Sequence, residues 1–233
     1  MLPDEVSFAG GEHLDPDYVA AYDRKAAFDP TWDVSLLRRH GLWSDSTLID
    51  LGGGSGTLAL AAAPHCRRVV LVDISAEMVA AAKQKADRLG IANVECVQSS
   101  FLRYEHQGSP ADFVYSRNAL HHLPDFWKAL ALERVVQMLR PGGYFRLRDL
   151  VFAFDPAEAE QVIGAWLDAA ANRSEDGWTR SELERHLRDE HSTFNWVLEP
   201  MLERAGFVIE EAEYGPERVF ASYRCVKLVK DSR

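Results

Sequence analysis

The stretch TLIDLGGGSG, residues 47–56, carries most of the information about the fold of this chain. Five residues with the composition of a buried strand run into a turn with four glycines, and the apolar run TLALAAA at residues 57–63 follows as a helix. Glycine has no β-carbon, so a ligand can approach the backbone of such a turn closely, and the unpaired N–H groups of the helix start face the same place. The sequence therefore predicts a strand–turn–helix unit that holds a ligand, and a tight turn without a ligand is the weaker alternative.

The spacing of the glycines narrows the kind of ligand. Gly52, Gly54 and Gly56 follow a G-x-G-x-G pattern, whereas a dinucleotide site needs G-x-G-x-x-G and would have its third glycine at position 57. Thr57 stands there, which argues against a nicotinamide or flavin site. Asp73 ends the next strand, where a carboxylate can accept hydrogen bonds from a ribose diol. Its other possible role, capping the following helix, is better filled by Ser75.

Strands alternate with helices through the first two thirds of the chain. The expected strands are residues 47–51, 68–72, 94–97, 111–115 and 144–151, with a turn at 141–143; the helices between them are 57–63, 75–89 and 124–139. This order predicts an α/β fold with a Rossmann-like doubly wound sheet, mostly parallel, that binds ligands beyond the carboxyl ends of its strands. Two late runs, 207–214 and 218–229, flank Gly215–Pro216 and predict a C-terminal antiparallel hairpin.

The remaining segments are expected to decorate a single domain. Residues 1–44 form an N-terminal helical cover with helices at 15–28 and 32–40 behind a peripheral start, 45–154 the core, 155–192 a helical lid, and 193–233 the last helix and the hairpin. The segment TRSE, residues 179–182, has capping-box spacing. Aromatic side chains of this region either line a ligand pocket or pack in the hydrophobic core, and core packing is the favoured interpretation. These residues are Trp166, Trp178, His191, Phe194 and Trp196.

Composition limits the class of protein. The 233 residues carry a formal net charge of −10, from 36 acidic and 26 basic residues, which disfavours nucleic-acid binding. Three cysteines without close spacing predict free thiols. No apolar run approaches the roughly 20 residues of a membrane span. We expect a soluble cytoplasmic protein, monomeric or homodimeric, without a membrane partner.

Five motifs in order resemble those of class I S-adenosylmethionine-dependent methyltransferases. DLGGGSG at residues 50–56 resembles their motif I, and Asp73 resembles the acidic residue that ends their second strand. The others are ADFVYS at 111–116, NALHHLPD at 118–125 and LRPGG at 139–143. The N-terminal Tyr22–Asp23 is similar to the cofactor-covering helix of the quinone-biosynthesis subgroup.

The resemblance implies S-adenosylmethionine as cofactor and S-adenosylhomocysteine as product. It implies that the glycine loop packs on the methionine part, that Asp50 orients the loop and the cofactor's amino group, and that Asp73 holds the ribose. The other residues implied as cofactor contacts are Tyr22, Ile74, Met78, Ser100, Phe101 and Asn118. The chain departs from the family after its third strand, where Ser99–Ser100 stands in place of the usual aspartate for the adenine amine.

The acceptor side is less constrained, because methyl transfer depends mainly on alignment of the two reactants. The loop after the fourth strand should face the methyl group. His121 is the first candidate for a general base there, and His122 is the second. A metal site is not expected, because adjacent histidines diverge and no metal-binding motif accompanies them. Arg146, Arg148 and Asp149 form either a structural ion-pair network, which is favoured, or an acceptor site.

The sequence thus predicts methyl transfer to a small organic acceptor at an O, N or C atom. The alternatives are a regulatory protein that binds S-adenosylmethionine without transferring the methyl group, and an RNA methyltransferase. Charge disfavours the RNA enzyme, as does the absence of an Asn–Pro–Pro–Tyr-type motif after the fourth strand.

Overall fold

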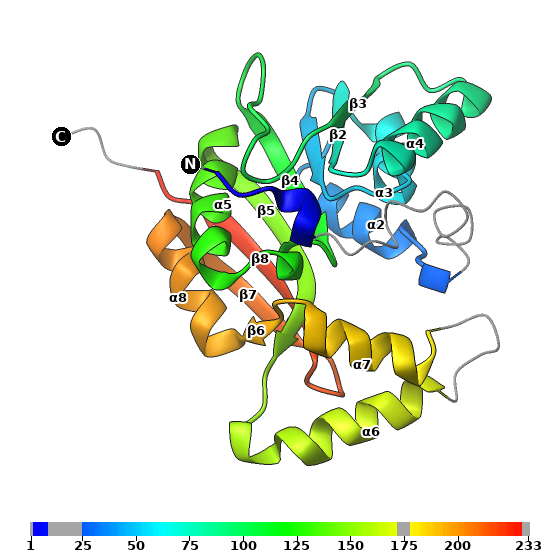
Figure 1. Ribbon diagram of the computed structural model, residues 1–233. Coiled ribbons are helices and arrows are strands. Elements are labelled where there is room, and N and C mark those ends of the chain that lie inside the picture. Colours follow the sequence, from blue (N-terminus) through cyan, green and yellow to red (C-terminus); the bar gives the residue numbers. More distant parts are fainter. Residues whose placement is uncertain (1, 9–24, 172–177, 230–233) are drawn as a thin grey trace.

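The computed structural model describes residues 2–8, 25–171 and 178–229 (Figure 1). Its centre is a sheet in the order β3-β2-β1-β4-β5-β8-β7, with the short β6 beside β5. The strands are β1 (Thr47–Leu51), β2 (Arg68–Asp73), β3 (Val94–Gln98), β4 (Ala111–Arg117), β5 (Leu139–Phe152), β6 (Thr193–Phe194), β7 (Phe207–Tyr214) and β8 (Phe220–Lys227). The first five strands pair in parallel and β8 is antiparallel to β5 and β7, which confirms the predicted fold class and the hairpin.

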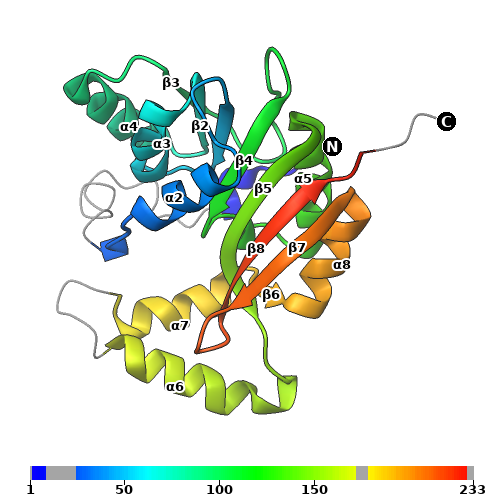
Figure 2. The ribbon, with the colours of Figure 1, turned by 180° about the vertical axis from the view of Figure 1, so that it is seen from behind.

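Helices cover both faces of this sheet because side chains alternate along each strand (Figure 2). Leu48, Val69 and Leu71 point to the face covered by α2 (Thr31–Arg39), α3 (Thr57–Ala62) with the short η3 (Ala63–His65), and α4 (Ala76–Leu89). Ile49 and Val70 point to the opposite face, covered by α5 (Asp125–Met138) and α8 (Asn195–Ala205). Both faces of the central strands are therefore buried, as their unbroken apolar runs require.

Two boundaries differ from the predictions. The expected turn at 141–143 lies within β5, which pairs with β4 from Leu139 onward and has a bulge opposite Ala111 and Phe113. Gly142, with φ of +68°, absorbs the bulge without ending the strand. Residues 193–194 form β6 rather than the start of the last helix.

The insertion 155–192 contains η5 (Pro156–Glu158), α6 (Ala159–Ala171) and α7 (Arg180–Asp189). Thr179 and Glu182 make the predicted capping box at the start of α7. The two helices lie side by side beyond the end of the sheet (Figure 1), where Trp166 and Leu183 pack on Leu150 and Val219. Trp166 is thus core, as favoured, whereas Trp196 is exposed.

Two further expectations concern cysteines and membrane spans. Cys66, Cys96 and Cys225 are all free thiols, as predicted. Within residues 2–8, 25–171 and 178–229, no helix has the length and hydropathy needed to cross a membrane.

Candidate functional site

The glycine loop is fixed to the carboxyl end of β2. The amide groups of Gly52 and Gly53 donate to the carbonyl of Val72 at 2.8 and 3.1 Å. Gly52 has φ of +69°, and a β-carbon on it would lie 2.3 Å from the β-carbon of Ala119. Only glycine fits there, because the loop touches the segment that follows β4.

Asp73 faces this loop from the end of β2. Its Oδ2 accepts a hydrogen bond from the Gly54 amide at 2.8 Å, and its Oδ1 accepts one from the Ser75 amide at 2.9 Å. Burial raises the pKa of Asp73, while these N–H donors oppose the rise. The Ser75 hydroxyl accepts from the Met78 amide and caps α4, as predicted, so Asp73 is left to face the cavity.

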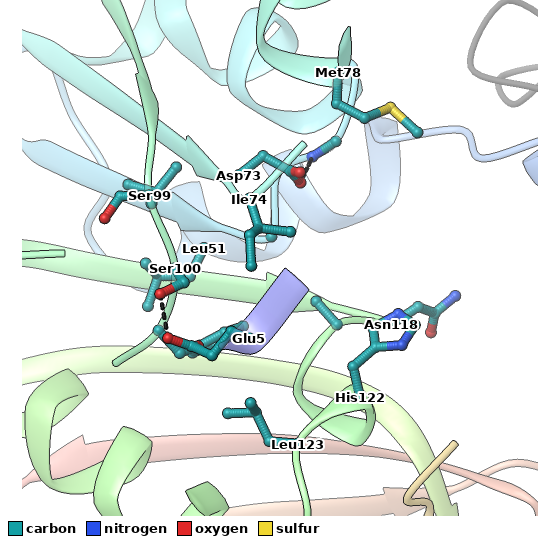
Figure 3. A pocket seen from close by; sticks show the side chains of 15 residues that line it. Glu5, Leu51, Asp73, Ile74, Met78, Ser99, Ser100, Asn118, His122 and Leu123 are labelled. Carbon is teal, nitrogen blue, oxygen red and sulfur yellow. Dashed lines mark hydrogen bonds between the residues drawn. The ribbon is translucent and has the colours of Figure 1, made fainter. Parts of the chain in front are cut away.

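A cavity opens beside Asp73 at the carboxyl ends of the strands (Figure 3). Most residues that the sequence predicted as cofactor contacts line it: Gly52, Gly54, Asp73, Ile74, Met78, Ser100, Phe101 and Asn118. The cofactor contact itself stays a prediction for each of them. Gly56 lines neither this cavity nor the one described below, among the described residues; it holds the left-handed cap of α3 and packs on Ala82 and Leu71.

Glu5 is a cavity residue that sequence reasoning missed. The short η1 (Glu5–Phe8) inserts it beside the end of β3, so the expectation of a peripheral start is wrong for Glu5, whereas Val6 and Ser7 are exposed. Its Oε1 accepts a hydrogen bond from the Ser100 hydroxyl (Figure 3), and its Oε2 accepts one from the Leu102 amide at 3.3 Å. Burial raises its pKa, whereas the hydrogen bond from Ser100 lowers it. No sequence signal links residues so far apart.

Asp50 lies on the opposite side of the glycine loop and is only 2% exposed. Burial, reinforced by the negative charge of Asp73, raises its pKa to about 7. Its Oδ2 has no hydrogen-bond partner in the described part of the chain. Asp50 lines a second cavity, together with Gly52, Gly53, Gly54, Ser55 and side chains that include Phe28, Tyr115, Arg117 and Trp178.

Asn118 lines both cavities, with Gly52 and Gly54, and so marks where they meet. Its φ is +50°, an uncommon conformation that two bonds to Arg148 maintain. The Asn118 amide donates to the Arg148 carbonyl at 2.8 Å, and the Arg148 guanidinium donates to Asn118 Oδ1 at 2.7 Å. Burial, with a contribution from nearby Arg117, lowers the pKa of Arg148 to about 10.

Arg146, Arg148 and Asp149 have the structural arrangement that the sequence favoured. Arg146 is buried, with guanidinium nitrogens 3.9 Å from Asp33 Oδ1 and 3.6 Å from Glu213 Oε2. Arg148 holds Asn118, and Asp149 binds His121. None of the three lines either of the two cavities, so direct acceptor binding by this strand is not supported.

His121 is placed differently from the prediction that it touches substrate. The chain after β4 turns into η4 (Leu120–His122), which directs His121 into the interior and leaves His122 on the cavity wall (Figure 3). Asp149 receives a hydrogen bond from the His121 backbone at 3.0 Å and contacts its Nδ1, while Nε2 lies 2.7 Å from Glu190 Oε2. Burial opposes protonation of His121, but Asp149 and Glu190 outweigh it and raise its pKa to about 9. Both ring nitrogens therefore face carboxylates rather than substrate.

Tyr22 lies outside the described residues. Its predicted cofactor contact stays a prediction, as does the resemblance to the quinone-biosynthesis subgroup that rests on Tyr22–Asp23.

Several known proteins are similar to this chain in sequence. Residues 48–143 match the family described as "Methyltransferase domain". The uncharacterized methyltransferase YcgJ of Bacillus subtilis is 31% identical over 119 residues, covering 51% of this chain and 46% of that protein. The ribosomal protein L11 methyltransferase of Symbiobacterium thermophilum is 33% identical over 135 residues, covering 57% and 41%. This chain spans about half the length of the curated relatives it matches.

Solved structures extend the likeness to nearly the whole fold. The magnesium protoporphyrin IX methyltransferase ChlM from Synechocystis, solved with S-adenosylmethionine bound, has a TM-score of 0.67 at 16% identity and covers 97% of this chain and 98% of its own. The cyclase SpnF has a TM-score of 0.64 at 15% identity, covering 84% and 80%. At such identities the likeness concerns the fold alone. Residues 48–143 thus match the methyltransferase-domain family, and the glycine loop with Asp50 and Asp73 lies within this matched part, where the sequence predicted the cofactor site of a class I S-adenosylmethionine-dependent methyltransferase.

Proposed function

We propose that this protein transfers the methyl group of S-adenosylmethionine to a small organic acceptor that carries a negative charge. The observation that supports this most is the pair of cavities that meet at Gly52, Gly54 and Asn118. One cavity suits the nucleoside of the cofactor, and the other suits its methionine part together with an acceptor.

The nucleoside side has donors and acceptors suited to adenosine. Asp73, held by two backbone N–H groups, keeps lone pairs for the ribose hydroxyls. Ile74 and Met78 offer an apolar surface to the base. Glu5, bonded to Ser100, supplies a carboxylate close to the place where the family has its aspartate, and so can accept a hydrogen bond from the adenine amine.

The methionine side is shaped by Asp50. The buried Oδ2 of Asp50, which has no hydrogen-bond partner among the described residues, suits the amino group of the cofactor, because an ammonium there would offset the desolvation cost of the carboxylate. The cofactor supplies a methyl group activated by its sulfonium. The protein then has to hold the acceptor in line with that group, which is a task of positioning.

The acceptor preference follows from the walls of the second cavity. Phe28, Tyr115 and Trp178 offer aromatic surface to an apolar body. The Arg117 guanidinium lies over the Phe28 ring, 4.0 Å from its centroid, and 3.7 Å from Asp33. A guanidinium on a cavity wall pairs well with a carboxylate. An aromatic or aliphatic acid is thus the acceptor class we propose.

The test is release of S-adenosylhomocysteine with paired acceptors, each acid beside its neutral amide. We expect turnover with acids, and we expect Arg117→Gln to raise KM for the acid while cofactor affinity is kept. Arg88→Gln, on the exposed side of α4, is the matched control. Equal turnover of acids and amides would refute the preference for an acidic acceptor. If none of the small acceptors leads to release of S-adenosylhomocysteine, methyl transfer to a small molecule is refuted.

RNA has to be tested separately as an acceptor. The tRNA 5-carboxymethoxyuridine methyltransferase of Escherichia coli is 30% identical to this chain over 104 residues, covering 43% of this chain and 38% of that enzyme. We expect no methylation of bulk tRNA, given the net charge of −10. Transfer to tRNA would favour this second function. Cofactor binding without transfer to any acceptor would favour a regulatory protein.

A further inference from the structure

Four side chains converge behind the cavity wall, on the side of the helical insertion. His121 comes from η4, Asp149 from β5, His186 from the last turn of α7, and Glu190 from the position directly after α7. The Nε2 of His121, the Nδ1 of His186 and a carboxylate oxygen of Glu190 all lie within 4.8 Å of one another. These side chains lie in segments far apart in the sequence, so the fold itself creates the cluster.

Within this cluster, Glu190 contacts both histidines at the distances of ion pairs. Glu190 Oε2 lies 2.7 Å from His121 Nε2 and 2.6 Å from His186 Nδ1. Glu190 Oε2 and His121 Nε2 are both buried, and apart from the contacts within this cluster neither atom has a hydrogen-bond partner in the described part of the chain. A cation that binds here would replace the protons shared between the histidines and Glu190, because metal-binding histidines are neutral.

Asp149 adds the outer partner that such a site needs. Its carboxylate contacts His121 Nδ1 and accepts from the His121 amide at 3.0 Å, which fixes the ring and turns Nε2 toward Glu190. A metal-binding histidine almost always has its other nitrogen on a carboxylate or carbonyl, and this partner orients the ring. The side chains of His121 and Glu190 are 3% and 9% exposed, so the cluster is largely shielded from water.

We propose that His121, His186 and Glu190 bind a divalent transition-metal ion of the zinc class, which fastens α7 to the segment after β4. Two imidazoles and one carboxylate are a known zinc donor set. The His191 amide already donates to the His121 carbonyl at 3.0 Å, so the metal would strengthen an existing junction between the insertion and the core. The sequence argument against a metal considered His121 and His122 alone; the spacing of His186 and Glu190, four apart on a helix, was the missed signal.

The experiment measures metal binding by the whole chain without cofactor or acceptor. Absence of metal binding can therefore be distinguished from absence of methyl transfer, which tests the proposed function. The protein is stripped with a chelator, dialysed, and titrated with Zn²⁺ in competition with a chromophoric chelator. We expect one tight site per chain. When Zn²⁺ is replaced by Co²⁺, the protein should show the visible absorption spectrum of Co²⁺ bound by nitrogen and oxygen ligands. This readout does not depend on enzyme activity.

The variants assign the site to these residues. His186→Ala and Glu190→Gln should weaken Zn²⁺ binding by more than the roughly 10–100-fold expected for the outer-partner variant Asp149→Asn. His186→Cys should keep the site, since a thiolate also binds zinc, and add a sulfur charge-transfer band with Co²⁺. The control is His65→Ala. His65 lies just before the amino end of β2, whereas the cluster lies near the carboxyl ends of β4 and β5, so this variant should bind Zn²⁺ as the original protein does.

Hydrogen exchange tests the fastening role. Zn²⁺ should slow exchange of the amides of residues 180–189 in the original protein and leave them unchanged in folded His186→Ala. The proposal is overturned if the stripped protein takes up no Zn²⁺, or if His186→Ala, Glu190→Gln and His65→Ala all bind it as the original does. It is also overturned if bound Zn²⁺ leaves the exchange of α7 unaltered.

Discussion

Asp50→Asn should stabilise the cofactor-free protein at alkaline pH while it removes cofactor binding. The carboxyl has a pKa of about 7 in the folded chain, against an ordinary value of 3.8, because it is buried and close to Asp73. Between these two values the folded protein holds a proton that the unfolded chain has lost. The free energy of unfolding therefore decreases as pH rises from about 4 to about 7, and stays reduced above that.

The size of the effect follows from the pKa. The displacement of about three pKa units corresponds to about 4 kcal/mol at pH 8, of which about 3 kcal/mol develops between pH 5 and pH 8. An asparagine does not titrate and retains an oxygen for the hydrogen bond from the Ala59 backbone. At roughly 2–4 °C per kcal/mol for a chain of this size, the Tm advantage of the variant should grow by roughly 6–12 °C between these pH values.

The assay is thermal unfolding of both proteins at several pH values without cofactor, with calorimetric titration of S-adenosylmethionine beside it. Asp87→Asn, an exposed position on α4, is the control and should show no pH-dependent advantage. An Asp50→Asn advantage that is the same at pH 5 and pH 8, or that shrinks toward pH 8, would refute the electrostatic reasoning. Undiminished cofactor affinity in that variant would refute the contact with the amino group.

Three further outcomes are expected from single substitutions. Asp73→Ala removes the ribose acceptor and should weaken S-adenosylmethionine binding about 10-fold or more in calorimetry, as loss of a charged hydrogen-bond acceptor costs about 1.5–3 kcal/mol; unchanged affinity would exclude the ribose contact. Glu5→Gln should lower affinity for S-adenosylmethionine more than for an analogue without the adenine amine, and an equal loss for both would count against adenine recognition. Thr179→Ala, which breaks the capping box of α7, should lower the unfolding free energy by about 1 kcal/mol in denaturant titration; Ser109→Ala, at an exposed position outside α7, is its control, and equal losses would contradict the role of the cap.

Local patterns were sufficient to predict the central sheet. The runs at 47–51 and 68–72 are short, apolar and bounded by turn residues, so their type and approximate limits follow from residues that are adjacent in the chain. The alternation of strands with helices predicted that these strands are parallel, whereas their order across the sheet was not predicted. The bulge in β5 was missed because a proline followed by two glycines is also the composition of a turn, and only pairing with β4 decides between the two.

The site was predictable where its residues sit at strand ends and not where distant segments meet. Asp73 and Asn118 follow strands and line the cavity as expected. Glu5 reaches Ser100 from 95 positions away, and His121 meets Glu190 across the insertion, so no local spacing reports either contact. His121 was assigned to the cavity because its loop faces the site. In η4, however, His121 is buried and its neighbour His122 lines the cavity.

The close approach of Gly52 and Ala119 has an evolutionary consequence. A single methyl group separates the two loops, and a β-carbon added at Gly52 would lie 2.3 Å from it. Gly52 cannot enlarge while Ala119 keeps its β-carbon, so a relative with a larger residue at the position of Gly52 should have glycine at the position of Ala119, or a displaced glycine loop. Such a displacement would also move the junction of the two cavities at Gly52 and Asn118. The residues at the positions of Gly52 and Ala119 can therefore be used, from sequence alone, to find relatives in which the glycine loop contacts the segment after β4 as it does here.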